Sequence, residues 1–96
     1  MKGGEIMRDS LHVKIMTPDR IFFEGESESV TVKTGGGDRQ ILLNRRPFSS
    51  KINPGIVKLK IDGKEKKLAT AGGFINTEYK SVTIVTHYAT WETEQA

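Results

Sequence analysis

The residue types that most often carry chemistry are few and scattered in this chain of 96 residues. Its two histidines, His12 and His87, lie within or just after alternating apolar segments. Neither spacing nor composition supplies the further ligands that zinc needs or the partner that orients a general base, so we interpret both as structural or surface residues. Glu24, Glu26 and Glu28 alternate along an extended segment, which is typical of a solvated strand edge. The sequence therefore predicts no catalytic residue, no metal site and no cofactor.

A glycine triplet at residues 35–37 invites comparison with phosphate-binding loops. Such a loop joins a strand to a helix and carries a lysine followed by serine or threonine. Here Asp38 and Arg39 follow the triplet and lead into another extended segment. We therefore predict a β-turn at this position.

The positive charge of the chain is concentrated in its middle third. The net charge is +3, but residues 35–67 alone carry nine basic and three acidic side chains, a balance of +6. Such a block can bind nucleic acid, anionic lipid or an acidic protein surface. Domains that bind single strands interleave cations with aromatic stacking platforms, and Phe48 is the one aromatic residue of this stretch. Nucleic acid is therefore a partner that the sequence allows but does not favour.

Composition indicates one folded, water-soluble domain. The chain is 35% hydrophobic and 28% charged, and its length suits a single domain. No apolar run approaches the roughly 20 residues that cross a bilayer, and the N-terminus lacks the apolar stretch of a secretory signal. The chain has no cysteine, which fits a reducing cytosol.

Apolar residues recur with a period of two, which indicates strands with one buried face. Turn residues separate nine or ten such runs and no helix is indicated, so two packed sheets or a closed barrel are expected. We predict an all-β fold, a β-sandwich over residues 11–90, with a flexible segment at 1–10 and a frayed tail at 91–96. The residues expected to point inward are Leu11, Val13, Ile15, Val30, Val32, Val57, Leu59, Ile61, Val82 and Ile84.

Five segments in unbroken order, from residue 11 to about residue 90, resemble the epsilon subunit of F-type ATP synthases. The sequence GDRQILLNRRP at 37–47 is similar to the family's loop-and-turn signature, usually written GELGILPGHAP. The other similar segments are LHVKIMTP at 11–18 with IFFEG at 21–25, VTVKT at 30–34, INPGIV at 52–57, and AGGF at 71–74 with VTIVTHYA at 82–89.

This resemblance implies a ten-stranded β-sandwich, or flattened barrel, of the epsilon N-terminal type, without the C-terminal helical hairpin of full-length members. It also implies a non-catalytic subunit of the central stalk, which links the gamma shaft to the c-ring and couples ion translocation to ATP synthesis. Such a subunit is peripheral, at the cytoplasmic face of the cell membrane, with no cofactor, no direct membrane insertion and no nucleic acid partner. The alternative is a stand-alone β-barrel module that binds single-stranded nucleic acid or carbohydrate.

The resemblance also suggests contact residues. Asp38 and Arg45 match family positions that lie near the c-ring loops. The family's Pro-Gly-His turn reads Leu43-Asn44-Arg45 here, and we expect Asn44 to preserve the turn because asparagine tolerates positive φ. Arg45 adds permanent charge, so we hypothesise a c-ring loop that is more acidic than usual. The region near Phe48 is the expected gamma contact, because a stalk contact needs an exposed apolar patch.

Overall fold

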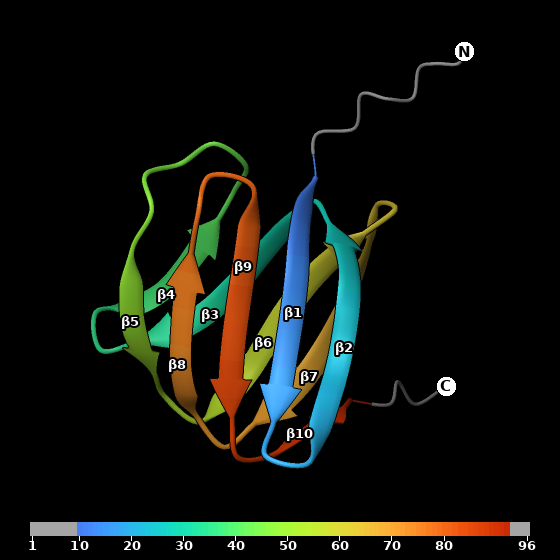
Figure 1. Cartoon of the computed structure of the whole chain (residues 1–96), viewed down its shortest axis with the longest axis vertical. Helices are drawn as coiled ribbons and strands as arrows, with labels where there is room; N and C mark the ends of the chain where they lie inside the picture. The colour runs from blue at the N-terminus through green and yellow to red at the C-terminus, as the bar shows by residue number, and fades with distance from the viewer. Residues whose placement is uncertain (1–9, 93–96) are drawn as a thin grey trace.

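Ten strands make up residues 10–92, the part of the chain that the computed structural model describes. Sheet A has the strand order β2-β1-β9-β8-β5, sheet B has the order β10-β7-β6-β3-β4, and the two pack face to face (Figure 1). Residues 10–92 include no helix of the length and apolarity that crossing a membrane requires. The strands are β1 (Leu11–Thr17), β2 (Arg20–Ser27), β3 (Ser29–Thr34), β4 (Gly37–Ile41), β5 (Ser49–Ile52), β6 (Gly55–Ile61), β7 (Lys64–Thr70), β8 (Gly73–Thr77), β9 (Ser81–Thr86) and β10 (Ala89–Trp91).

This architecture confirms the predicted ten-stranded β-sandwich. The predicted flexible segment at 1–10 lies, apart from Ser10, outside the described residues. The predicted tail at 91–96 begins with Trp91, which ends β10, and continues with Glu92, whose N–H donates to the Lys67 carbonyl at 2.9 Å. Residues 93–96 of that tail lie outside the described part of the chain.

The core lies between the two sheets and consists of aliphatic side chains from both. The predicted inward residues are buried, except that Ile61 is half-buried beside the turn of the β6–β7 hairpin. Burial of each such side chain contributes about 1.5–3 kcal/mol, so this shared interior is what holds the sheets together. The buried core residues are Leu11, Val13, Ile15, Val30, Val32, Ile41, Ile52, Val57, Leu59, Leu68, Ile75, Val82 and Ile84.

Two predicted turns have the expected backbone. Asp62 and Gly63 have φ of 54° and 77°, as a tight hairpin between β6 and β7 requires. Asn44 has φ of 62°, which confirms that asparagine preserves the turn after β4. The strand pairs are antiparallel with one exception, since β1 lies parallel to β9 and so joins the two ends of the described chain.

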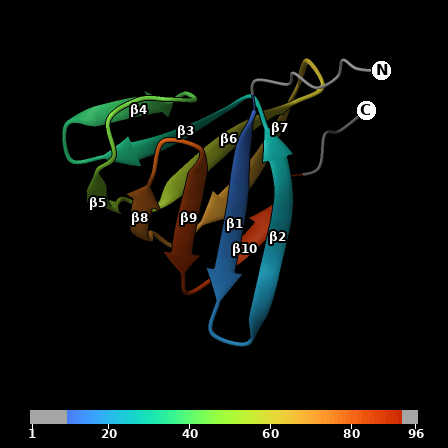
Figure 2. The ribbon, with the colours of Figure 1, turned by 45° about the horizontal axis from the view of Figure 1, so that its top comes forward.

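The two open sides of the sandwich are closed in different ways. Strands β2 and β10 lie at one side and β4 and β5 at the other (Figure 2). At the first side the Trp91 ring lies 5.3 Å from the Phe22 ring and 5.7 Å from the Phe23 ring, measured between centroids. A register shift in β2 leaves Phe22 as an extra residue, because Ile15 lies opposite Phe23 and Met16 opposite Ile21. At the second side, the segment 42–48 crosses from sheet B to sheet A.

Gly73 at the start of β8 provides a test of this packing. It has φ of 149°, and a Cβ added there would overlap the Val85 carbonyl oxygen and lie 3.0 Å from the Thr86 Cα. We expect Gly73→Ala to lower the free energy of unfolding by about 2–4 kcal/mol, measured by urea denaturation. Gly35→Ala is the matched control, because an added Cβ there has no atom within 4 Å, and its effect should stay within about 0.5 kcal/mol. Equal midpoints for the two variants would contradict this account of β8.

Candidate binding surfaces

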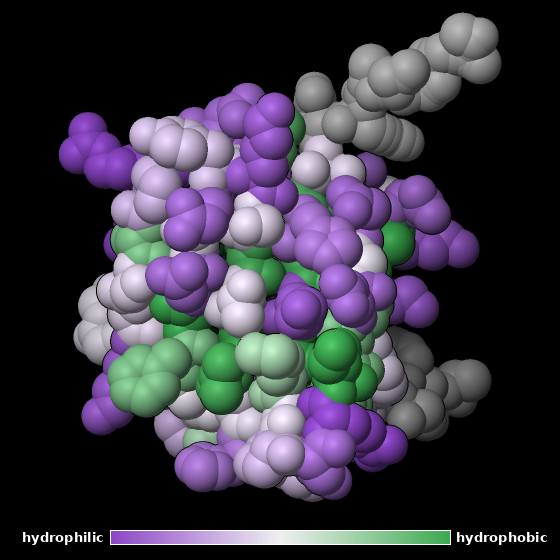
Figure 3. Space-filling view, in the orientation of Figure 1, coloured by the Kyte–Doolittle hydropathy of each residue, from purple (hydrophilic) through white to green (hydrophobic). Residues whose placement is uncertain are grey.

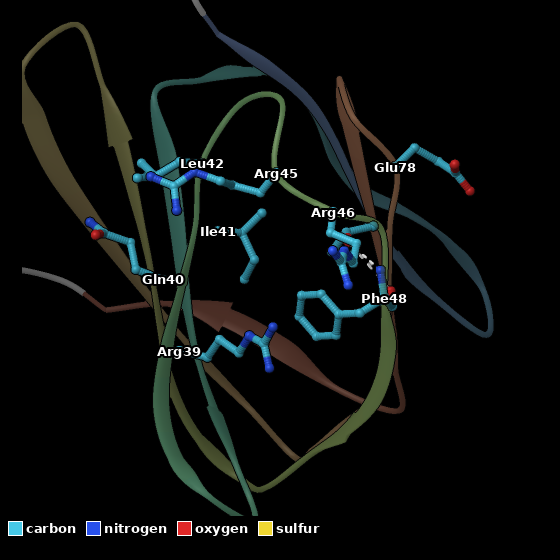
Figure 4. Close-up of a pocket in the computed structure, with 9 residues that line it drawn as sticks. Arg39, Gln40, Ile41, Leu42, Arg45, Arg46, Phe48 and Glu78 are labelled. Atoms are coloured by element: carbon cyan, nitrogen blue, oxygen red, sulfur yellow. Dashed lines mark hydrogen bonds between the residues drawn. The ribbon is translucent and has the colours of Figure 1, made fainter.

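A cavity of about 210 Å³ lies at the side of the sandwich where 42–48 crosses between the sheets. We call it the arginine pocket, because Arg39, Arg45 and Arg46 line it together with the ring of Phe48. In Figure 4, the guanidinium groups of Arg39 and Arg46 flank the Phe48 ring, while Arg45 extends from the crossing segment toward Leu42. The pocket therefore combines three permanent positive charges with one aromatic face.

The backbone of sheet A holds the aromatic part of the pocket in place. The Phe48 N–H donates to the Thr77 hydroxyl at 2.9 Å, and the Thr77 N–H donates to the Phe48 carbonyl at 2.8 Å. Arg39 lies opposite the buried Val32 in the β3–β4 ladder, so its side chain emerges on the inner side of β4. The Arg39 Cζ atom lies 3.9 Å from the centroid of the half-buried Phe48 ring, a cation–π contact that fixes the guanidinium.

These arginines have no anionic partner within the described chain. Among residues 10–92, no carboxylate oxygen lies within 4.0 Å of a guanidinium nitrogen of Arg39, Arg45 or Arg46. Glu78 is the acidic residue of the lining, and its side chain points away from the arginines (Figure 4). The pocket can therefore attract an anionic group such as a carboxylate or a phosphate.

The residues that the sequence suggested as contacts are not brought together. Asp38 lies near the start of β4, where its Oδ1 is 3.3 Å from the Lys33 Nζ on the outer face of sheet B. Arg45 follows the other end of β4 and lines the arginine pocket. Phe48 is half-buried beneath Arg39. Asp38 and Arg45 therefore belong to different surfaces.

An exposed apolar row crosses the outer face of sheet A. It consists of Ile21, Met16, Val85 and Phe74, one residue from each of β2, β1, β9 and β8. Cross-strand pairing makes these residues neighbours, since Met16 lies opposite both Ile21 and Val85, and Val85 lies opposite Phe74. Ile21, Val85 and Phe74 are 49%, 47% and 63% exposed.

Figure 3 shows the row as a green band below a polar region of the same face. Single exposed apolar residues are common, but a contiguous patch over four strands is typical of an interaction site. Sequence reasoning missed this row. A signal was available in the sequence. Strict alternation would place a polar residue next to each buried one, but in several strands two apolar residues are adjacent, as at Ile84-Val85.

The polar region of the same face contains a histidine between two carboxylates. The His12 Nε2 lies 2.8 Å from a Glu24 oxygen, and its Nδ1 lies 3.1 Å from a Glu26 oxygen. These hydrogen bonds, with that to Glu24 the larger cause, raise the pKa of His12 above its ordinary value of 6.5. His12 is therefore a surface histidine, as interpreted from the sequence, but its two glutamate partners were not predicted because the β1–β2 register was not evident from the sequence. Within residues 10–92, no group of three or more acidic or histidine side chains could hold a metal ion.

The raised pKa makes His12 a contributor to stability at low pH. Protonated His12 holds the carboxylates of the edge strand, so its contribution is complete below pH 6.5 and is lost as pH rises through its raised folded-state value. We expect the difference in urea midpoint between the wild type and His12→Gln to shrink between about pH 5.5 and 8.5. His87→Gln is the control, because no carboxylate pairs with His87 in the described chain. A difference that grows with pH would contradict the assignment.

Residues 10–92 match the family model described as the β-sandwich domain of the ATP synthase delta/epsilon chain. The ATP synthase epsilon chain of Clostridium novyi is 36% identical over 89 residues, which cover 92% of this chain and 68% of the relative. The ATP synthase epsilon chain of Maricaulis maris is 36% identical over 83 residues, which cover 86% of this chain and 62% of that relative. The chain thus spans about two thirds of the length of these relatives.

The fold is also found in a solved structure. A chain of the Euglena gracilis mitochondrial ATP synthase, in a cryo-EM structure of its OSCP/F1/c-ring assembly, superposes with a TM-score of 0.82. The superposition covers 95% of this chain and 58% of that one, at 20% identity, which shows a common fold. Because the family model matches all the described residues, this chain belongs to the family of ATP synthase delta/epsilon chains, to which it is related through their β-sandwich domain.

Proposed function

We propose that the chain is a non-catalytic subunit of the central stalk of an F-type ATP synthase. In this role it links the gamma shaft to the c-ring, so that rotation driven by ion translocation reaches the catalytic head and supports ATP synthesis. The observation that carries the proposal is that a member of this family presents two surfaces of different chemistry, the apolar row and the arginine pocket, on one close-packed body. A rigid body with two binding surfaces is what transmission of torque requires.

The apolar row is the proposed contact with gamma. It is contiguous and apolar, which suits a lasting interface between subunits that turn together. Phe48, the expected gamma contact, offers less exposed apolar surface because Arg39 covers its ring. We therefore assign the gamma contact to the apolar row on sheet A, and the Phe48 region to the arginine pocket.

The side of the sandwich around β4 is the proposed contact with the c-ring. Arg45 would approach the ring loops from the arginine pocket, and Asp38 from the outer face of sheet B. A chain with a similar fold is found in the solved structure of the central stalk and c-ring of the Tetrahymena thermophila mitochondrial ATP synthase. The chain would then lie at the cytoplasmic face of the membrane as a peripheral subunit, without entering the bilayer and without a cofactor.

Nucleic acid is a weaker candidate on this structure. The lysines on the outer face of sheet B, such as Lys58 and Lys67, share that surface with Asp38 and Glu92. The most exposed aromatic side chain, Phe74, lies on sheet A instead. The lysines of sheet B and the most exposed aromatic ring are therefore on different faces, and the one ring of the arginine pocket is already covered by Arg39, which does not suit a single-strand binding groove.

The gamma contact can be tested with matched variants in β8. Phe74 and Asn76 both project from the outer face of sheet A and are both exposed, but only Phe74 belongs to the apolar row. We expect Phe74→Glu to weaken binding to gamma by about 2 kcal/mol or more, roughly thirtyfold, measured by isothermal titration calorimetry. Asn76→Glu should bind within about twofold of the wild type. Loss of binding in Asn76→Glu alone would place the interface elsewhere.

A further inference from the structure

We propose that the arginine pocket receives an acidic side chain from a polar loop of the c-ring. This inference rests on the proposed function and names the chemistry of its second contact. The occupant is a carboxylate of an aspartate or glutamate, held between Arg46 and Arg39 near the Phe48 ring, with Arg45 at the rim.

The size of the pocket favours a single side chain. Its volume of about 210 Å³ is smaller than the roughly 300–1,000 Å³ of sites that enclose small molecules. A carboxylate that enters with its peptide still outside fits such a space, since only the end of the side chain needs to be enclosed. A nucleotide base and sugar would remain largely exposed.

The arrangement of the donors favours a carboxylate. Guanidinium groups form paired hydrogen bonds with the two oxygens of a carboxylate, and they keep their charge at every physiological pH. Arg39 is held by its contact with Phe48, and Phe48 is held by three hydrogen bonds with the buried Thr77. The donor is therefore positioned before a partner binds, which lowers the entropy that binding costs.

Charge complementarity separates this pocket from the other basic surfaces. Lys33 is paired with Asp38, and the lysines of the outer face of sheet B lie beside Glu65 and Glu92. Among the residues that line the arginine pocket, Glu78 is the one acid, and it points away from the arginines. Of these three basic surfaces of residues 10–92, the pocket is thus the one whose acidic residue turns away from the cations, so an external anion can supply the compensating charge.

Binding of the purified full chain to the detergent-solubilised c-ring of the same ATP synthase tests the proposal. We expect wild-type binding to weaken steeply between about 50 and 200 mM salt, because ion pairs at a surface are screened. Arg46→Glu and Arg45→Glu should each bind about tenfold to hundredfold more weakly at low salt. Arg20→Glu makes the same substitution at the exposed β1–β2 turn, outside the pocket and away from β4, and should bind within about twofold of the wild type. Arg46→Gln removes the charge without reversing it and should also weaken binding to the ring. The urea midpoint of each variant should match that of the wild type, which shows that the loss is one of binding and not of folding.

A reciprocal change identifies the occupant. If the acidic residue of the ring loop is replaced by arginine, wild-type binding should fall and Arg46→Glu should recover it. Equal ring binding by the wild type and both arginine variants would overturn the pocket while leaving the proposed function intact. A wild-type chain that binds gamma but not the ring would overturn the ring contact, and one that binds neither would overturn the proposed function itself. Binding of inorganic phosphate or single-stranded RNA that Arg46→Glu abolishes, with ring binding unchanged, would assign the pocket to that ligand instead.

Discussion

Every surface feature of this protein depends on the contact between the inner faces of its two sheets. Each sheet has one face of aliphatic side chains, and neither face is stable in water unless the other covers it. Residues such as Ile15, Leu59 and Ile84 are fully buried there, and close packing makes the pair of sheets stiff. The outer faces and the side between β4 and β5 are left for binding.

The two open sides show how differently one fold can treat equivalent positions. Between β2 and β10 the gap is filled by Phe22, Phe23 and Trp91, which exclude water and stabilise the edge. Between β4 and β5 the gap holds Phe48 with an arginine over its ring. One side therefore contributes to stability, whereas the other is polar enough to bind a charged partner. The two sides of the sandwich therefore offer different chemistry to a partner.

The strands and the core were predictable from the sequence because alternation is a local signal. Leu11, Val13 and Ile15 alternate with polar residues, and burial of one face follows directly from that period. The turn at Asn44 and the hairpin at 62–63 were predictable for the same reason, since positive φ favours particular residue types. Local chemistry thus determined where strands begin and end.

What could not be predicted depends on register between strands that are distant in sequence. The pairing of His12 with Glu24 and Glu26 depends on the β1–β2 register, which includes a bulge that cannot be predicted from the sequence. The apolar row needs the parallel pairing of β1 with β9, across nearly the whole chain. Arg39 could be grouped with Arg45 and Arg46 by charge, but the stacking on Phe48 depends on how the segment 42–48 crosses between the sheets. The pairing of strands that are distant in sequence therefore determines which residues come together on the candidate surfaces.

The central claim is that one rigid sandwich contacts two different subunits through two different surfaces. Cysteine cross-linking in the assembled ATP synthase tests it most directly, with single cysteines at Phe74 and at Arg45 in a chain that has no cysteine of its own. We expect the cysteine at 74 to form its adduct with gamma and the cysteine at 45 to form its adduct with the c subunit. Adducts of both cysteines with the same subunit, or exchanged between the two, would contradict it.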